Sequence, residues 1–180
     1  PVSLAWILAL IARLLVTGCL HEDGLADFFD GFGGGTTRER TLAIMKDSHI
    51  GSYGVIGLIC YFLLLFQLHH LPLGLLCILV LSGDCWSKFC ASQIVNYLPY
   101  ARKEEDSKSK TVYNRMSWHE LLAGFLCGLL PFVLLLPIKL WIATLFPLLT
   151  FFLLYRLMKR RLQGYTGDCC GATFLLCELS

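Results

Sequence analysis

Long apolar blocks alternate with short polar segments along the chain. The first block runs from Val2 to Leu20, the second from Gly51 to Leu68, and the third begins after Pro72 and reaches Tyr97. A helix needs about 20 mainly apolar residues to cross roughly 30 Å of hydrocarbon. The pattern therefore predicts helices that span a membrane.

The apolar block Leu121–Tyr155 is too long for one crossing. Its only charged residue is Lys139, and its 35 residues would measure about 52 Å as one helix. Two helices must therefore turn near Pro137. A last span is expected to start near Gly171 and is cut off by the end of the sequence. We expect an all-α, polytopic bundle of about five to six spans, with further membrane sequence at both ends.

The polar segments give this bundle an orientation. Three of them, at 21–50, 99–120 and 156–168, fall on the same face when successive helices alternate in direction. Twelve of the fifteen Lys and Arg residues then lie on that face, whereas Lys139 lies in an opposite loop. Because basic loops are retained on the cytoplasmic side, this face is predicted to be cytoplasmic.

Composition narrows the class of protein further. The 180 residues are 56% hydrophobic and only 16% charged, with a mean hydropathy of +0.65, whereas soluble domains have about 25% charged residues. A net charge of +2 gives no global basic field for nucleic acid. The nine cysteines form no Cys-x-x-Cys pair and are expected to be small hydrophobic residues. The polar segment Lys103–Lys110 is predicted to be a mobile, solvated loop without chemistry.

Three aspartates after the first apolar block suggest a metal site. Asp23, Asp27 and Asp30 are spaced by four and three residues, so on a helix they fall within about 60° of one another. Unpaired carboxylates this close would repel each other, and a divalent cation resolves the conflict. Mg²⁺ prefers such oxygens and often takes substrate phosphates as its other ligands. The alternative is a solvated or capping helix end.

Glycines and cations follow the acidic residues. Gly33–Gly35 lack Cβ atoms, so their backbone amides are able to approach an anion closely. Arg38, Arg40 and Lys46 are then candidates to hold phosphate oxygens. Taken singly, the glycines also fit a flexible turn, and the arginines fit a solvated or headgroup-facing pair.

Other polar residues have two interpretations each. Asp84 and Lys88, four apart, either neutralise each other or line a substrate path. Arg13 either snorkels to the interface or has a functional role. His21 either packs at the interface or orients a carboxylate and moves a proton. Asp168 is an N-cap candidate or one more carboxylate on the same face.

Several segments, in their order along the chain, resemble the cobalamin synthase family, the adenosylcobinamide-GDP ribazoletransferases. They are HEDGLAD at 21–27, DG at 30–31, RER at 38–40, MKDS at 45–48, IGSYG at 50–54, LPYAR at 98–102, YTGD at 165–168 and GAT at 171–173. The resemblance covers almost the whole chain.

The resemblance implies a reaction in which the 3′-hydroxyl of α-ribazole, or of its 5′-phosphate, attacks the phosphate attached to cobinamide and expels GMP. It implies Mg²⁺ as cofactor, small-molecule substrates and no nucleic acid. Residues 1–180 are then a single transmembrane catalytic domain in a bacterial or archaeal inner membrane, with its active-site loops on the cytoplasmic face. A homo-oligomer and association with other cobalamin-assembly enzymes stay open.

The same resemblance suggests a role for each candidate residue. Asp23, Asp27, Asp30 and Asp47 would bind the metal, and Asp27 or Asp47 would accept the hydroxyl proton, with His21 as a further catalytic candidate. The remaining candidates would bind phosphate or other polar groups of the substrates: Gly33, Gly34, Gly35, Arg38, Arg40, Lys46, Arg102 and Asp168.

Some features depart from the family, and two other classes compete. Family members often have an apolar residue at Glu22. CDP-alcohol phosphotransferases are built around an Asp-Gly-x-x-Ala motif. Here Asp23-Gly24-Leu25-Ala26 is followed by Asp27 instead of the Arg expected in that family, and its later Gly-x-x-x-Asp-x-x-x-Asp run is missing. A divalent-cation or solute transporter would need polar groups near the membrane midplane, and only Arg13, Asp84 and Lys88 are available for that.

Overall fold

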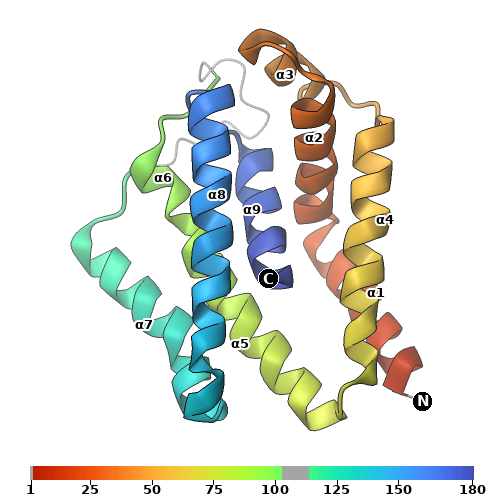
Figure 1. Ribbon diagram of the computed structural model, residues 1–180, viewed down its shortest axis with the longest axis vertical. Helices are drawn as coiled ribbons and strands as arrows, with labels where there is room; N and C mark the ends of the chain where they lie inside the picture. Colours follow the sequence, from red (N-terminus) through yellow and green to blue (C-terminus); the bar gives the residue numbers. More distant parts are fainter. Residues whose placement is uncertain (1, 103–113) are drawn as a thin grey trace.

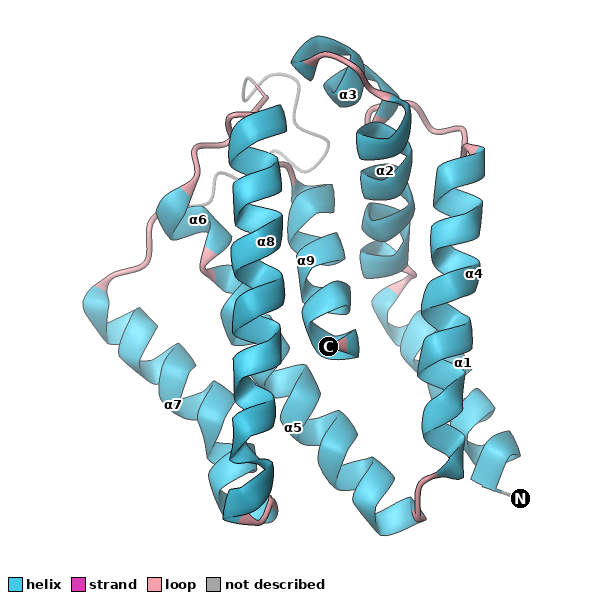
Figure 2. Ribbon diagram, in the orientation of Figure 1, coloured by secondary structure: helices cyan, strands magenta, loops and turns pink. Residues whose placement is uncertain are grey.

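The computed structural model describes residues 2–102 and 114–180, and these residues are almost entirely helical (Figure 1, Figure 2). Outside the helices, the described residues form one isolated β-bridge, between Tyr100 and Tyr165. The helices are α1 (Val2–Thr17), α2 (Leu20–Gly34), α3 (Arg38–Ile44), α4 (Ser52–Phe66), η1 (Gln67–His70), α5 (Leu73–Ser92), α6 (Ile94–Tyr97), α7 (Trp118–Leu135), η3 (Ile138–Thr144), α8 (Leu145–Arg161) and α9 (Gly167–Leu179).

Local sequence sets several of these helix boundaries. The side chain of Ser117 accepts a hydrogen bond from the backbone N–H of Glu120, whose carboxylate in turn accepts from Ser117, so α7 begins with a capping box. Thr37 caps α3 and Thr166 caps α9 in the same way, through their side-chain oxygens.

Four helical segments of the described chain are long and apolar enough to cross a membrane. They are Ser52–His70, Leu73–Tyr97, Trp118–Leu135 and Ile138–Arg161. The first two segments confirm the predicted second and third spans. The last two confirm that the apolar block 121–155 contains two helices with a turn near Pro137. A fifth span results if α1 and α2 are one broken span. Because large apolar side chains cover the outward faces, the protein is an all-α polytopic membrane protein.

The beginning and the end of the chain differ from the prediction. Instead of one helix to Leu20, α1 ends at Thr17 and the chain bends by 87° into α2. The bend lies at Gly18 and Cys19, which both have positive φ, 61° and 57°. At the other end, α9 begins at Gly167, earlier than expected, and has 13 residues.

Most of α2 was expected to belong to a polar segment, but it is a central helix. Leu25 and Phe28 are buried in the main core. The helix packs against α9 at very close range. A Cβ added to Gly24 would lie 3.1 Å from the Asp168 backbone, and one added to Gly171 would lie 3.3 Å from the His21 backbone. Small residues at a crossing let two helix backbones approach each other in this way.

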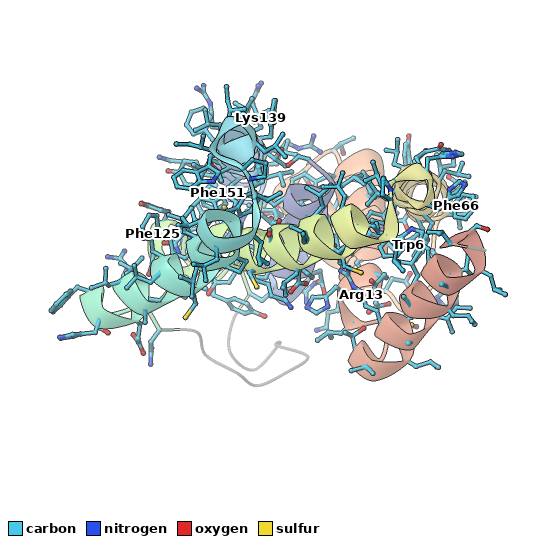
Figure 3. All side chains as sticks on the ribbon, turned by 90° about the horizontal axis from the view of Figure 1, so that it is seen from below. Trp6, Arg13, Phe66, Phe125, Lys139 and Phe151 are labelled. Atoms are coloured by element: carbon cyan, nitrogen blue, oxygen red, sulfur yellow. The ribbon has the colours of Figure 1, made fainter. Side chains whose placement is uncertain are left out.

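The helices form two packed groups joined by α5 and α9. The larger core cluster draws residues from α1, α2, α4, α5, α8 and α9, and the second cluster joins α5, α7 and the end of α9. Seen from below, Phe66 at the end of α4 and Phe125 in α7 lie on opposite sides of the bundle (Figure 3). Residues of α9 belong to both clusters: Cys169, near its start, lies in the larger cluster, and Cys177, near its end, lies in the second.

The polar connections gather at one end of the bundle. The residues around α3 and the connection from α8 to α9 lie together at the top of Figure 1, while η3, which contains Lys139, lies at the bottom. This arrangement agrees with the predicted alternation of the spans. That this end of the bundle faces the cytoplasm stays a prediction. The segment Lys103–Lys110 lies outside the described residues.

Candidate functional site

A cavity of about 690 Å³ lies between α2, α5 and α9, near the end of the bundle that carries the polar connections. Its wall includes apolar residues such as Leu20, Val95 and Phe174. The ionisable residues in the described part of the wall are His21, Asp23, Lys88, Tyr100, Arg102, Arg115, Glu120, Asp168 and Cys170. Five residues that the sequence singled out therefore share one cavity: His21, Asp23, Lys88, Arg102 and Asp168.

Backbone pairing brings two distant motifs together at this cavity. The N–H of Ala101 donates to the carbonyl oxygen of Tyr165 at 2.8 Å, and the N–H of Tyr165 donates to that of Pro99 at 3.0 Å. The two backbones are also close at Gly164, just before Tyr165, where an added Cβ would lie 2.6 Å from the Pro99 carbonyl oxygen. The segments LPYAR and YTGD thus lie side by side, about 60 residues apart in sequence.

Arg102 and Asp168 form a buried ion pair in the cavity wall. The Nη2 atom of Arg102 lies 3.5 Å from the Oδ2 atom of Asp168, and their side chains are only 6% and 14% exposed. Thr166 donates a hydrogen bond to the same Asp168 oxygen at 3.3 Å. The Nε atom of Arg102 is buried and has no hydrogen-bond partner in the described part of the chain. Arg102 therefore retains a donor for a ligand.

Within the predicted acidic stripe, Asp23 and Asp27 differ from Asp30. Asp23 is exposed and lines the cavity, and Asp27 follows one helical turn later on the same face of α2. Asp30 is 7% exposed, and its two oxygens accept hydrogen bonds from the backbone N–H groups of Gly51 and Gly54 at 2.7 and 2.8 Å. Asp30 thus caps α4, whereas its predicted role was metal binding.

The described residues contain no group of three or more His, Cys, Asp or Glu side chains arranged to hold a metal. Asp47, the fourth predicted ligand, lies on an exposed loop, where its Oδ1 atom pairs with Nδ1 of His49 at 2.7 Å. The hydrogen bonds from His49 lower the pKa of the Asp47 carboxyl, and the same pairing raises the pKa of the His49 imidazole. Metal binding at Asp30 and Asp47 stays a prediction without support from their surroundings.

The glycine run does not present free backbone amides as expected. Gly33 and Gly34 belong to the last turn of α2. A Cβ on Gly33 would lie 2.6 Å from the ring of Tyr53, so a side chain here would displace that ring. The carbonyl oxygens of Gly35 and Phe32 accept hydrogen bonds from Arg161. The C-terminal end of a helix carries partial negative charge, which disfavours an anion there.

The predicted phosphate-binding cations also have other surroundings. Arg38 donates from Nε to the carbonyl oxygen of Leu162 at 2.8 Å and from Nη2 to that of Ala101 at 2.7 Å. It thereby holds the α8–α9 connection against the segment that carries Arg102. Arg40 and Lys46 are exposed, and neither is among the described residues that line the cavity.

In the described part of the chain, two charge pairs join residues that both belong to helices, and only one of these pairs was predicted. Lys88 and Asp84 pair on α5 at 2.7 Å, as their spacing predicted. The other pair joins Arg13 of α1 to Glu178 of α9 through two hydrogen bonds of 2.7 and 2.8 Å. A lone acid in an apolar stretch was the signal for Glu178, because isolated charges at membrane depth usually have a partner.

The fold and the cavity define a class of protein: an integral membrane protein whose cavity is lined by charged residues and built from broken and closely crossing helices. The model of the family described as cobalamin-5-phosphate synthase matches residues 1–180. The chain belongs to this family.

Curated relatives agree with this assignment. A protein of Shewanella amazonensis is 44% identical, over 99% of this chain and 71% of its own length. One of Shewanella woodyi is 40% identical, over 100% of this chain and 72% of its own length. One of Vibrio parahaemolyticus is 38% identical, over 99% and 68%. All three are named adenosylcobinamide-GDP ribazoletransferase. No solved structure matches the chain.

Proposed function

We propose that this chain joins adenosylcobinamide-GDP to α-ribazole, or to α-ribazole 5′-phosphate, and releases GMP. Family membership supports the activity. The observation that carries the proposal is that the segments HEDGLAD, LPYAR and YTGD, distant in sequence, contribute side chains to one cavity: Asp23, Arg102 and Asp168. Function has to be argued from such a site, because helical bundles support many activities.

The chemistry requires positioning and charge neutralisation. A bond forms between the 3′-oxygen of the acceptor and the phosphorus attached to cobinamide, and the bond from that phosphorus to the oxygen of GMP breaks. The acceptor hydroxyl gives up its proton, and GMP leaves with the electron pair. Displacement at a diphosphate of this kind depends mainly on alignment and electrostatics rather than on a covalent protein intermediate.

Asp27 is the better placed of the two proposed bases. It lies on the same face of α2 as Asp23, one turn from the cavity wall. Asp47 lies on an exposed loop and pairs with His49. Arg102 and Asp168 are suited to bind polar groups of the substrates, because both line the cavity and Arg102 has a donor to spare.

Mg²⁺ is part of this proposal, and Asp23 with Asp27 would hold it. Mg²⁺ commonly takes one or two carboxylates and completes its shell with waters and substrate phosphates. Two adjacent carboxylates on one helix face fit that requirement, whereas both oxygens of Asp30 already accept backbone hydrogen bonds. When bound, the ion would neutralise charge on the diphosphate.

The proposed location is the cytoplasmic membrane of the cell, with the polar connections in the cytoplasm. The basic residues at that end of the bundle support the orientation. A transporter is less well supported, because the intramembrane charges Arg13 and Lys88 pair with Glu178 and Asp84.

Activity is tested with the purified chain in lipid nanodiscs containing Mg²⁺. Adenosylcobinamide-GDP is supplied with each acceptor in turn, and GMP and the cobamide product are quantified by liquid chromatography with mass detection. The proposal predicts equal amounts of GMP and cobamide. GMP released without cobamide, or no GMP with either acceptor, would contradict it.

A further inference from the structure

We call the end of the cavity nearer the polar connections its mouth and the opposite end its deep end. The helices α2 and α5 run towards the polar connections, and α9 runs away from them (Figure 1). His21 therefore lies deeper than Asp23, Lys88 deeper than Ser92, and Phe174 deeper than Asp168, although all six residues line the same cavity. Asp23 and Asp168 lie towards the mouth, whereas His21 and Lys88 lie at the deep end, where Lys88 pairs with Asp84.

Three basic side chains surround the ring of Phe174 at this deep end. The Nζ atom of Lys88 lies 5.3 Å from the ring centroid, and Cζ of Arg13 lies 5.4 Å from it. The His21 ring meets it edge-on, with 4.9 Å between centroids. An aromatic ring attracts cations within about 6 Å without neutralising them. Phe174 thus holds Lys88 and Arg13 beside the cavity, each paired with a carboxylate, Asp84 or Glu178.

Lys88 is the cation that a ligand is able to reach. Arg13 is already bound by both carboxylate oxygens of Glu178. Lys88 has one partner, Asp84 at 2.7 Å, and an ammonium group has three protons to donate. Its side chain is 57% exposed, against 28% for Asp84, so the ammonium lies on the accessible side of the pair.

The beginning of α2 adds to the positive potential. Its N-cap residue, Cys19, makes no side-chain hydrogen bond to the helix. The first N–H groups of a helix have no partner within it, and they carry partial positive charge. Leu20 and His21, in this first turn, line the deep end.

Unsatisfied donors in the cavity wall are independent evidence that the cavity takes an acceptor-rich ligand. The side chain of Arg102 is 6% exposed, and its buried Nε atom has no partner among the described residues. The Nδ1 atom of His21 is also buried and has no partner among the described residues, and it is a donor in the tautomer that carries its proton on Nδ1. A buried polar atom without a hydrogen bond is costly, and a bound anion would satisfy such donors.

We propose that Lys88, His21 and the first turn of α2 form an anion-binding site for a phosphate group at the deep end of the cavity. The inference rests on the proposed function. Either substrate is able to supply the group: the donor has a diphosphate, and one acceptor has a 5′-phosphate. The site is separate from the carboxylate pair Asp23 and Asp27, which lies nearer the mouth.

Steady-state kinetics of Lys88→Gln test the proposal, with Lys88→Arg as the conservative variant and Lys139→Gln as the control. Lys139 is exposed and lies at the opposite end of the bundle. The KM is measured for adenosylcobinamide-GDP, α-ribazole and α-ribazole 5′-phosphate. Hydrogen bonds to charged groups contribute enough that we expect Lys88→Gln to raise one KM about tenfold or more. Lys88→Arg should retain most of the affinity, and Lys139→Gln should match the unmodified chain.

The substrates identify the source of the phosphate. A raised KM for α-ribazole 5′-phosphate, with α-ribazole unchanged, assigns the site to the acceptor phosphate. A raised KM for adenosylcobinamide-GDP with either acceptor assigns it to the donor. Unchanged KM values for all three substrates in Lys88→Gln would overturn the proposal, and activity of the unmodified chain in the same assay keeps the proposed function separate from this outcome.

A second variant separates ligand binding from a structural ion pair. Asp84→Asn removes the competing partner of Lys88, so the anion-binding site predicts a lower KM for the same phosphorylated substrate. A purely structural pair predicts that Lys88→Gln and Asp84→Asn both lower thermal stability and leave KM alone. If the two substitutions shift KM in the same direction, the proposal is wrong.

Discussion

Replacement of Gly24 by alanine tests how the crossing of α2 and α9 determines the site. The added Cβ would lie 3.1 Å from both the Cα and the carbonyl oxygen of Asp168, closer than the ordinary contact range of 3.4–4 Å. Both atoms belong to the backbone, so α9 has to move by a few tenths of an ångström. Overpacking of this kind costs about 1–3 kcal/mol, and the better helix propensity of alanine returns at most about 1 kcal/mol. We expect a net loss of about 1–2 kcal/mol in the free energy of unfolding.

The matched control is Gly83→Ala on α5, where an added Cβ would have no neighbour within 4 Å. Unfolding is followed by circular dichroism in mixed micelles with increasing SDS, and GMP release is measured in parallel. Gly83→Ala should be as stable as the unmodified chain or slightly more stable, with full activity. Gly24→Ala should lose stability and turnover, because the shift displaces Asp168 from Arg102. Equal stability and full turnover in Gly24→Ala would refute the reasoning.

Three further predictions concern groups outside the cavity. Glu178→Gln leaves the guanidinium of Arg13 without its carboxylate and should lower the free energy of unfolding in SDS by about 3 kcal/mol or more. The double variant that also carries Arg13→Gln should recover part of this loss. Additive losses from the two substitutions would argue against coupling. Asp30→Ala should cost about 1–2 kcal/mol, and Asp30→Asn less, because Asp30 caps α4; equal losses would count against the capping role. The pKa of His49, measured by NMR, should lie above its usual value and should fall in Asp47→Asn. Because the pKa is higher in the folded state, any stabilisation from this pair is present below about pH 6.5. It is lost as the pH rises through the folded-state pKa.

The spans were predictable because membrane crossing depends mainly on length and apolar content. The turn near Pro137 follows from simple arithmetic on helix rise. The break at Gly18 and Cys19 was not predictable, because a left-handed conformation is uncommon for a residue such as cysteine. The central position of α2 was missed because its acidic residues suggested an interfacial segment, whereas Leu25 and Phe28 bury the other face.

The candidate site was predictable in residue type more than in position. His21, Asp23, Arg102 and Asp168 meet in one cavity, and the structure brings them together through the α2–α9 crossing and the bridge between residues 100 and 165. Arg38 has structural partners instead. Residues that bind phosphate also cap helices and bind carbonyl oxygens, so sequence alone does not separate these roles.

The glycines illustrate the same ambiguity. A missing Cβ serves close approach to an anion and close approach to another side chain equally well. At Gly33 the neighbour is the ring of Tyr53, and at Gly24 it is the backbone of α9. Only the three-dimensional arrangement shows which neighbour each glycine accommodates.

The central claim is that Asp23, in the cavity wall, and Asp27, one turn further along α2, support Mg²⁺-dependent transfer. It is tested most directly by the rate of GMP release from Asp27→Asn across a Mg²⁺ titration, with Glu39→Gln, an exposed acid on α3, as control. The account predicts a loss of about 10²-fold or more for Asp27→Asn and none for Glu39→Gln. An Asp27→Asn enzyme with full activity at every Mg²⁺ concentration would contradict it.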